Sequence, residues 1–171
     1  MRNGEQGIAI RKGELDDLAR LTEIYNHYVE NTAITFDIDP FTIEQRREAW
    51  LVKYSDSAIY RLLVAVCDGL VIGYATSGKF REKPAYTSSV ETSVYLDSKH
   101  TRSGVGTALY NQLFKELKRT PIHRAYAGIT LPNEGSIALH QKMGFKQIGR
   151  YHEVGFKFGK YHDVMWFEKA L

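Results

Sequence analysis

The sequence predicts a mixed α/β domain, and three features of the chain lead to this prediction. Its 171 residues, of which 43% are hydrophobic, are enough to bury a substantial core within one ordinary domain. Segments with helical spacing alternate with β-branched runs, in the order strand, two helices, three strands, helix, strand, helix and two strands. No repeat, low-complexity tract or flexible linker divides the sequence. Residues 1–171 are therefore expected to form a single domain, with one face of the sheet left free for a ligand.

The N-terminal part is expected to hold a short strand and two helices. Residues 8–13 form the strand, which ends in a glycine turn. Residues 14–31 form an amphipathic helix, whose apolar spacing comes from Leu15, Leu18, Leu21, Ile24, Tyr25 and Tyr28. A loop over residues 32–40 follows. Thr42, three residues before a glutamine, then predicts a capping box and a helix that runs through about Lys53.

From residue 60 the pattern changes to strands. Residues 60–67 and 70–80 flank Asp68-Gly69, a strong signal for a two-residue hairpin turn. A third long strand over residues 87–96 is rich in β-branched side chains. The remaining expected elements are a helix from Val105 to about Arg119, a strand over 122–130, a short helix between Asn133 and Gly144, and two final strands over 145–159 and 160–170.

Composition narrows the classes of function. The formal net charge of +3 would help an anionic small molecule approach, but it is too weak and dispersed for a nucleic-acid-binding protein. Residues 1–15 lack the apolar core of a signal peptide, and the longest strongly apolar run, residues 62–67, is too short to span a bilayer. The single cysteine rules out an intrachain disulfide. We therefore expect a cytoplasmic protein that binds neither nucleic acid nor a membrane.

Residues 100–110, HTRSGVGTALY, hold the most informative local pattern. Gly104 and Gly106 stand two apart, between the end of a predicted strand and the start of a predicted helix. A helix N-terminus presents unpaired N–H groups and the positive end of the helix dipole, so it suits an anion. Glycines there let the backbone approach the ligand closely. The alternative is that the two glycines only make a tight strand-to-helix turn.

Two common phosphate-binding motifs do not fit this stretch. The sequence has no G-x-x-x-x-G-K-[ST] pattern, and G-V-G lacks the third glycine of a Rossmann fingerprint. The arrangement R/Q-x-x-G-x-G/A between a long strand and a helix instead resembles the coenzyme A pyrophosphate loop of the GNAT acetyltransferase superfamily. Thr101 stands where that loop usually has Gln or Arg, so one polar contact to the pyrophosphate is expected to be weaker.

Within that superfamily, the sequence resembles the phosphinothricin N-acetyltransferase-like family, which also contains enzymes acting on methionine sulfone and methionine sulfoximine. The resemblance covers nearly the whole chain, through residues 24–37, 80–86, 89–96, 130–145 and 155–169. It implies the GNAT fold, acetyl-CoA as cosubstrate and a homodimer. The acetyl-CoA contacts that it implies are Ser93, Val94, Tyr95, Leu96, Thr101, Arg102, Ser103, Gly104, Val105, Gly106, Thr107, Asn133 and Ser136. Asn133 also has a structural interpretation, as the N-cap of the short helix.

Glu91 is the first candidate for catalysis. It lies mid-strand among residues that favour a packed sheet, where a carboxylate is costly unless it faces a cleft or a partner. The resemblance implies that it is the general base, acting directly or through water. The alternative is an exposed strand glutamate on the solvent face.

His140 is the second candidate. It lies in the short helix where many superfamily members carry a tyrosine thought to protonate the leaving thiolate, and an imidazole can exchange a proton near neutral pH. The alternative is a surface or half-buried helix histidine. Tyr95 is another possible acid, although a sheet tyrosine that packs against a neighbouring element explains it as well.

Arg81 and Phe36 are the candidates for substrate binding. A guanidinium suits a carboxylate or phosphinate, and the resemblance implies that Arg81 recognises the acidic end of the substrate. A solvated loop arginine is the alternative. Phe36 follows the first helix and could line the pocket or belong to the core.

Other catalytic chemistries have little support in the sequence. Cys67 ends an apolar strand with no histidine near it in sequence, so it is a poor nucleophile and direct transfer in a ternary complex is expected. The six histidines lack ligand spacing, so we expect no metal.

The sequence thus predicts an acetyl-CoA-dependent N-acetyltransferase of a small amino acid such as phosphinothricin, methionine sulfone or methionine sulfoximine. A protein N-terminal or lysine acetyltransferase is one alternative. A non-catalytic coenzyme A-binding sensor is another, and it would not need Glu91 and His140.

Overall fold

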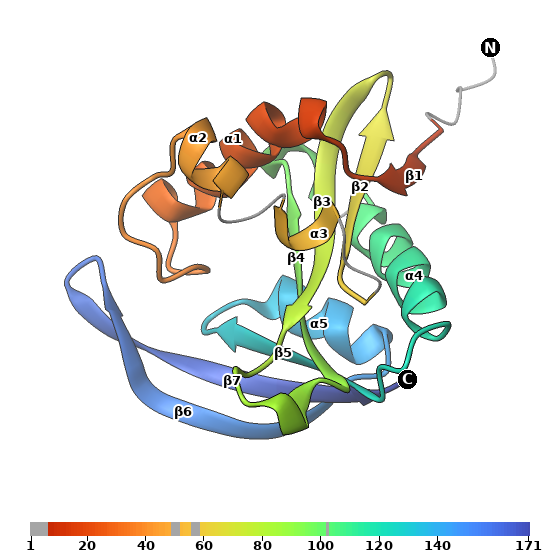
Figure 1. Ribbon diagram of the computed structural model, residues 1–171. Coiled ribbons are helices and arrows are strands. Elements are labelled where there is room, and N and C mark those ends of the chain that lie inside the picture. The colour runs from red at the N-terminus through yellow and green to blue at the C-terminus, as the bar shows by residue number, and fades with distance from the viewer. Residues whose placement is uncertain (1–6, 49–51, 56–58, 102) are drawn as a thin grey trace, which may run out of the picture.

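A computed structural model describes residues 7–48, 52–55, 59–101 and 103–171 (Figure 1). Seven strands form one sheet in the order β1-β2-β3-β4-β5-β7-β6, in which β4 and β5 are parallel and every other neighbouring pair is antiparallel. The strands are β1 (Ala9–Lys12), β2 (Arg61–Cys67), β3 (Leu70–Lys79), β4 (Ser89–Leu96), β5 (Arg124–Thr130), β6 (Lys146–Lys157) and β7 (Lys160–Ala170). The helices are α1 (Leu18–Asn31), α2 (Ile43–Arg46), α3 (Val52–Ser55), α4 (Val105–Leu117) and α5 (Glu134–Lys142). The predicted mixed α/β class and the predicted order of elements are confirmed.

Local signals in the sequence account for several element boundaries. Thr42 and Gln45 form the expected capping box at α2, with Thr42 Oγ1 accepting from the Gln45 N–H at 3.2 Å. Asp68 and Gly69 both have positive φ angles, 50° and 78°, as a two-residue hairpin turn of the primed type requires. Gly144, with a φ of +83°, follows the end of α5.

One detail of the predicted helices was wrong. Leu15 lies in a 3₁₀ turn ahead of α1, which takes it off the apolar face, and it is 53% exposed. The helix expected from Thr42 to Lys53 is described in two pieces, α2 and α3, and residues 49–51 between them lie outside the described part of the chain.

Two helices cover the opposite faces of the central strands. The face of α4 that carries Leu109 and Leu113 packs on the side of the sheet that holds Leu63 and Ala75. Leu21 and Ile24 of α1 pack on the alternate side chains of β2 and β3, which point the other way, including Val64 and Tyr74. Strand β3 is consequently buried along almost all of its length. The sequence analysis expected one face of the sheet to be free for a ligand. Over these central strands that expectation is wrong, because a helix covers each face.

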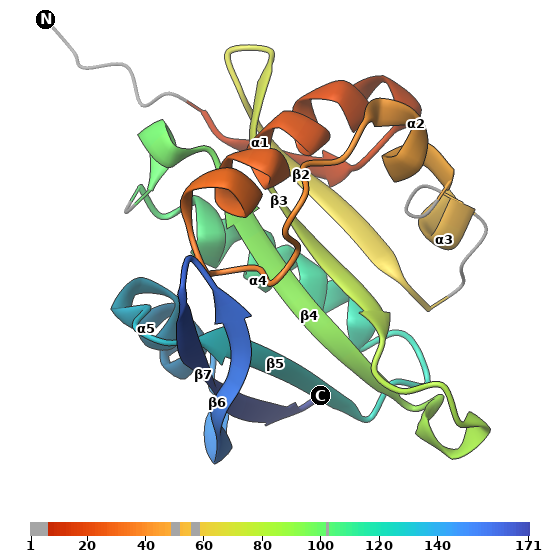
Figure 2. The same cartoon turned by 90° about the vertical axis from the view of Figure 1, so that its left-hand side faces the viewer.

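Open space arises where β4 and β5 separate. The two strands pair only over Ser89–Glu91 and Arg124–Tyr126, although β4 continues to Leu96 and β5 to Thr130. Figure 2 shows them close together at one end and apart at the other, with α5 beside the open end. The edge of β4 beyond Glu91 that faces β5 has no strand partner in the described sheet. Backbone N–H and C=O groups on that edge are available to a ligand.

No described helix combines the length and the apolar character needed to cross a bilayer.

Candidate functional site

A cleft of about 630 Å³ extends from the separated strands to the start of α4 and along α5. Gly104 is the N-cap of α4 and has a φ of +82°, a conformation that favours glycine. Apart from its two chain neighbours, no described residue has an atom within 4 Å of the position where a Cβ of Gly104 would stand, so the backbone is open to a ligand there. A Cβ on Gly106 would lie 3.0 Å from the Leu139 side chain, so this glycine also allows α4 and α5 to approach each other. The loop therefore combines an open helix N-terminus with tight packing of the two helices that border the cleft.

Most of the predicted acetyl-CoA contacts lie around this cleft. Those that line it are Val94, Tyr95, Leu96, Thr101, Gly104, Gly106, Thr107, Asn133 and Ser136. Ser93 lines two neighbouring cavities instead. Val105 is buried in the core, and the Ser103 hydroxyl donates to the backbone carbonyl of His100. Arg102 lies outside the described residues.

The N-terminus of α5 forms one wall of the cleft. Asn133 Oδ1 accepts from the Ser136 N–H at 3.1 Å, so the predicted cap is present and also lies at the cleft surface. Tyr28, Ile34, Gly135 and Lys142 line the cleft as well, although the sequence did not mark them as site residues. Tyr28 was assigned to the buried face of α1, because an apolar stripe does not distinguish a core position from one at the rim of a cleft.

Glu91 lies at the last β4–β5 pair, opposite Tyr126, where the strands begin to separate. It lines a second cavity of about 200 Å³ and is half-buried, so it is not a solvent-face glutamate. Burial raises the pKa of Glu91 above its usual value, while the charges of Arg81 and Lys53 oppose that rise. A carboxylate with a raised pKa is a stronger base than an ordinary carboxylate, so it is better suited to accept a proton from an ammonium group.

The cavity beside Glu91 is rich in charge and in tyrosine side chains. Arg46, Lys53 and Lys79 line it together with Glu91, so cations outnumber the carboxylate among the described lining residues. Its tyrosines are Tyr25, Tyr54, Tyr74 and Tyr95. A small molecule that carries one ammonium group, a carboxylate and further oxygen atoms matches this distribution of charge.

Tyr95 lies where three cavities meet. It lines the large cleft, the cavity beside Glu91 and a narrow cavity of about 50 Å³ between β4 and β5. Its ring stacks on Tyr74 with a centroid distance of 5.5 Å and meets Tyr25 edge-on at 5.0 Å. Burial raises the pKa of Tyr95, so the phenol keeps its proton at physiological pH. Tyr95 is therefore both packed against its neighbours and placed at the junction of the site.

His140 is buried, with only 3% of its surface exposed, and it borders the narrow cavity. Its Nδ1 lies 2.7 Å from the backbone oxygen of Ser136, which can only accept, so Nδ1 carries a proton. Its Nε2 lies 3.0 Å from the Tyr110 hydroxyl, which donates to it when the ring is neutral. Burial lowers the pKa of His140 and favours that neutral ring. This environment differs from the surface or half-buried histidine that was the alternative in the sequence.

The two predicted substrate-binding residues have different surroundings. Arg81 is exposed, with its guanidinium carbon 5.0 Å from the centre of the Phe80 ring, and its charge acts on Glu91. Phe36 is half-buried and packs against Gly155 of β6, 6.3 Å from the ring of His162. Phe36 therefore lies against the final hairpin, outside the residues that line the cavity beside Glu91.

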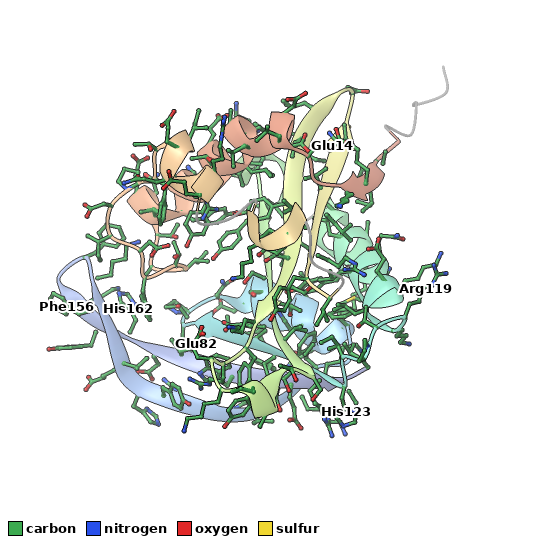
Figure 3. All side chains as sticks on the ribbon, in the orientation of Figure 1. Glu14, Glu82, Arg119, His123, Phe156 and His162 are labelled. Atoms are coloured by element: carbon green, nitrogen blue, oxygen red, sulfur yellow. The ribbon has the colours of Figure 1, made fainter. Side chains whose placement is uncertain are left out.

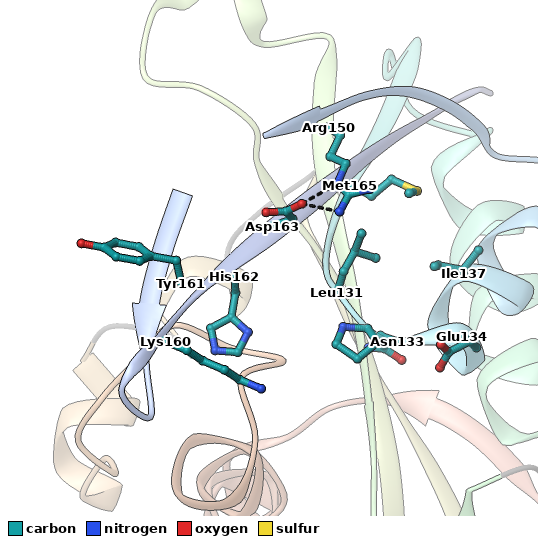
Figure 4. Close-up of a pocket in the computed structure, with 11 residues that line it drawn as sticks. Leu131, Asn133, Glu134, Ile137, Arg150, Lys160, Tyr161, His162, Asp163 and Met165 are labelled. Atoms are coloured by element: carbon teal, nitrogen blue, oxygen red, sulfur yellow. Dashed lines mark hydrogen bonds and ion pairs between the residues drawn. The ribbon is translucent and has the colours of Figure 1, made fainter. Parts of the chain in front are cut away.

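Another hollow, of about 540 Å³, lies between the N-terminus of α5 and strand β7 (Figure 4). Asn133 and Glu134 border one side of it, and Lys160 and His162 border the other. An ion pair between Arg150 and Asp163 closes its far end. Asn133 lines both this hollow and the large cleft.

Neither a metal centre nor a reactive thiol is apparent in the described part of the chain. No group of three or more described His, Cys, Asp or Glu side chains is arranged to hold a metal ion. Cys67 is buried at the end of β2, and desolvation and the neighbouring Asp68 raise the pKa of its thiol. A raised pKa disfavours the nucleophilic thiolate.

Comparisons with known proteins agree on one group of enzymes. The sequence profile of the acetyltransferase (GNAT) domain matches residues 10–166. A phosphinothricin N-acetyltransferase of Streptomyces coelicolor is 48% identical over 98% of this chain and 99% of its own length. An L-methionine sulfoximine/L-methionine sulfone acetyltransferase of Salmonella typhimurium is 35% identical over 96% of this chain and 95% of its own.

A solved structure gives the same result at the level of the fold. A phosphinothricin acetyltransferase from Sinorhizobium meliloti, crystallised in complex with acetyl-CoA, superimposes with a TM-score of 0.91 and is 30% identical. The match covers 96% of this chain and 88% of that structure.

Proposed function

This chain belongs to the GNAT acetyltransferase family and is an N-acetyltransferase that uses acetyl-CoA, and we propose that its acceptors are small amino acids with oxygen-rich side chains. Phosphinothricin, methionine sulfone and methionine sulfoximine are the proposed examples. The observation that carries the proposal is the cavity beside Glu91, which combines one carboxylate with three cations in about 200 Å³. Such a volume suits a single amino acid better than a folded peptide segment.

The large cleft is the proposed site of acetyl-CoA. Gly104, Gly106 and Thr107 would hold the pyrophosphate at the start of α4, and Asn133 and Ser136 would contact the pantetheine arm from α5. The unpaired edge of β4 supports this assignment, because it offers backbone groups along the whole length from Glu91 to Leu96. The bound cosubstrate supplies the thioester that the amine attacks.

Glu91 is the proposed general base. The ammonium group of the acceptor gives a proton to Glu91, directly or through water, and the free amine then attacks the thioester carbon. The new C–N bond forms, the C–S bond breaks and the thiolate of coenzyme A leaves. The nitrogen loses its second surplus proton in this step, which balances the proton that the thiolate takes up. A backbone N–H of β4 would stabilise the oxyanion that develops during attack. Direct transfer of this kind needs no enzyme nucleophile, which agrees with the buried position of Cys67.

His140 is proposed to assist departure of the thiolate, with Tyr95 as the alternative donor. Both side chains border the narrow cavity between the separated strands, beside the cleft proposed for acetyl-CoA. Tyr95 carries a proton that it can donate. His140 can donate from Nε2 only when that nitrogen is protonated, and it then no longer accepts the hydrogen bond from the Tyr110 hydroxyl.

We further propose that the active protein is a homodimer. The β6–β7 hairpin exposes several large apolar side chains, at Ile148, Tyr151, Val154, Phe156, Phe158 and Tyr161. The rings of Phe156 and Tyr161 pack against each other, and each residue is more than half exposed. Figure 3 shows Phe156 on this hairpin. Strand β6 is also an edge of the sheet. A second copy would cover such a face through a two-fold contact, because the same patch occurs on both chains.

Two broader predictions accompany this proposal. The match of the domain profile to residues 10–166 supports the expectation of one domain over residues 1–171. The use of acetyl-CoA and a buried free thiol at Cys67 support the cytoplasm as the place of action.

The experiment that tests the proposed function measures thiol release from acetyl-CoA against a panel of acceptors. The panel holds phosphinothricin, methionine sulfone, methionine sulfoximine, unmodified amino acids, polyamines and a short peptide. Saturable activity confined to the first three is the expected result, and Glu91→Gln should lower kcat by roughly 100-fold or more. Activity on the peptide alone would move the assignment to protein acetylation. Binding of acetyl-CoA without turnover of any acceptor would support a sensor.

A further inference from the structure

We propose that Arg46 selects the acceptor by binding the oxygen atoms at the far end of its side chain. Phosphinate, sulfone and sulfoximine groups share such oxygens, whereas the thioether of methionine lacks them. This inference rests on the proposed function, because it assigns a role within the acceptor cavity beside Glu91. It adds a residue on α2 that nothing in the sequence pattern had marked for binding.

The placement of Arg46 is unusual for its helix. Ile43, Glu44 and Gln45 of α2 are exposed, but Arg46 is only 7% exposed and its side chain lines the cavity that holds Glu91. An arginine is rarely buried to this extent, because desolvation of its charge is costly. Because Arg46 lies in the wall of this cavity, oxygen atoms of a molecule bound there can reach its guanidinium.

Aromatic rings fix the guanidinium in place. Its central carbon lies 4.2 Å from the centre of the Tyr25 ring and 5.2 Å from that of Phe41. Tyr25 is itself held in place, because its hydroxyl donates to the Asp37 carboxylate and accepts from the Thr35 hydroxyl. Because these contacts restrict the rotamers of Arg46, little side-chain entropy remains to be lost when a ligand binds.

The positive charges in and beside the cavity influence the pKa values of different residues. Burial raises the pKa of Glu91, and Arg81 and Lys53 are the cations that oppose this rise. Burial likewise raises the pKa of Tyr25 to about 12, and there the opposing cation is Arg46. The geometry agrees with this division. The Arg46 guanidinium stacks on Tyr25, whereas Lys53 Nζ lies 3.3 Å from the position of a Cβ on Gly78, the β3 residue paired with Glu91. Arg81 is exposed and acts on Glu91 from outside the residues that line the cavity.

The chemistry of the acceptor matches this division. The α-carboxylate shares a carbon with the reacting amine, so it must lie close to Glu91, within reach of Arg81 or Lys53. Two methylenes separate that carbon from the phosphinate or sulfone, which can therefore extend to the other end of the cavity. The faces of Tyr25 and Tyr95 would contact the methylenes on the way, and Arg46 would meet the oxygens.

A site with this arrangement rejects the unoxidised analogue strongly. If methionine occupied the cavity, its thioether would offer the guanidinium no oxygen to accept a hydrogen bond. A site that hydrogen-bonds a polar group of its substrate strongly rejects an analogue that lacks this group. An apolar pocket discriminates far less well between substrates that differ only in size. Arg46 should therefore set the ratio of activity on oxidised and unoxidised acceptors.

The test compares kcat/KM for methionine sulfone and phosphinothricin with that for methionine and norleucine. In Arg46→Met, the preference for the oxygen-bearing acceptors should fall by roughly 10- to 100-fold, mainly through a higher KM for these two. Arg46→Lys keeps the charge but not the planar guanidinium. Its preference for the oxygen-bearing acceptors should lie between those of Arg46→Met and the wild type. Arg47→Met is the matched control, because Arg47 is the exposed neighbour in the chain, and its preference should be unchanged.

Several outcomes would overturn the inference. A fall in activity on all four acceptors by the same factor would make Arg46 a structural residue, and an unchanged preference would remove it from the site. Loss of the preference in Arg81→Met but not in Arg46→Met would assign the role to Arg81. Acetyl-CoA binding by each variant, followed by calorimetry, reports whether it is folded, and Arg46→Lys carries the test if Arg46→Met is not. If the wild type acetylates none of the four, the proposed function itself fails.

Discussion

At the scale of single residues, charges near Glu91 set the pH at which it can accept a proton. A protonated Glu91 cannot act as a base, so kcat/KM should fall as the pH drops through its pKa. Because burial raises that pKa, the fall should occur at higher pH than for an ordinary glutamate.

Lys53→Met should move this fall in kcat/KM, the acidic limb of the pH profile, to still higher pH. Lys53 opposes the rise in the pKa of Glu91, so its removal leaves the effect of burial less compensated. A pH profile of kcat/KM measures the change. Lys146→Met, which removes an exposed lysine at the start of β6, is the control and should leave the limb in place. A limb that moves to lower pH in Lys53→Met would show that Glu91 is not the group titrating in the profile.

His140→Gln tests the proposed role of His140 in thiolate release. We expect kcat to fall by roughly 100-fold with little change in KM for the amino acid, as for loss of a group that handles a proton. Tyr95→Phe removes the other candidate donor and should have the smaller effect on kcat. The reverse order of the two effects would assign the donor role to Tyr95. A change confined to KM for acetyl-CoA would mean that His140 only positions α5, through its bond to Tyr110 of α4.

At the scale of elements, the loop between α1 and α2 is attached to the final hairpin. Lys157 of β6 is buried and its Nζ donates to the backbone oxygen of Thr35 at 2.9 Å. Phe36 packs directly on Gly155 of the same strand. The hydroxyl of Thr35 contacts that of Tyr25, whose ring lines the acceptor cavity. The position of the hairpin is thus linked to the wall of that cavity.

Gly155→Ala should loosen this attachment. The added Cβ would lie 2.2 Å from carbons of the Phe36 ring, so the ring or the strand must move, at a cost of about 1–3 kcal/mol in the free energy of unfolding. KM for the acceptor should rise several-fold as Tyr25 is displaced. Gly149→Ala is the matched control in β6, because no atom lies within 4 Å of its added Cβ. Equal effects of the two substitutions on stability and KM, measured by thermal melting and kinetics, would contradict the link.

The sequence could predict what local patterns determine. The capping box at Thr42, the turn at Asp68-Gly69 and the cap at Asn133 each depend on a few neighbouring residues, and all three are present. The separation of β4 and β5 depends instead on the paths of two strands that lie far apart in the sequence. No local pattern marks the residue at which their pairing ends.

The same distinction applies to the site. Glu91 could be singled out because a carboxylate amid β-branched residues is costly without a function. Arg46 could not, because an arginine at the end of a polar helical turn has the appearance of a solvent-exposed residue. Its burial comes from packing against Tyr25 of another helix. Tyr25 in turn was assigned to the core by its helical spacing, which also fits its place at the cavity wall.

At the scale of the whole molecule, the proposed dimer predicts a concentration-dependent mass. The double substitution Phe156→Ser and Tyr161→Ser removes two apolar side chains that are more than half exposed, so it should weaken association while leaving the chain folded. Sedimentation equilibrium measures the change in mass. Lys146→Met is again a control, and it should remain dimeric. A monomeric wild type at micromolar concentration would contradict the dimer.

The gap between β4 and β5 predicts that binding of acetyl-CoA stabilises the folded chain. Three residue pairs are all that the ladder between these strands provides, while ligand-facing groups lie on both sides of the gap. Acetyl-CoA would span the two sides and bind only the folded chain, so at 100 times its Kd it would add about 2.7 kcal/mol to the free energy of unfolding. When acetyl-CoA is scarce, more molecules should unfold and be degraded. The amount of enzyme would then follow the nutritional state of the cell without any dedicated regulator.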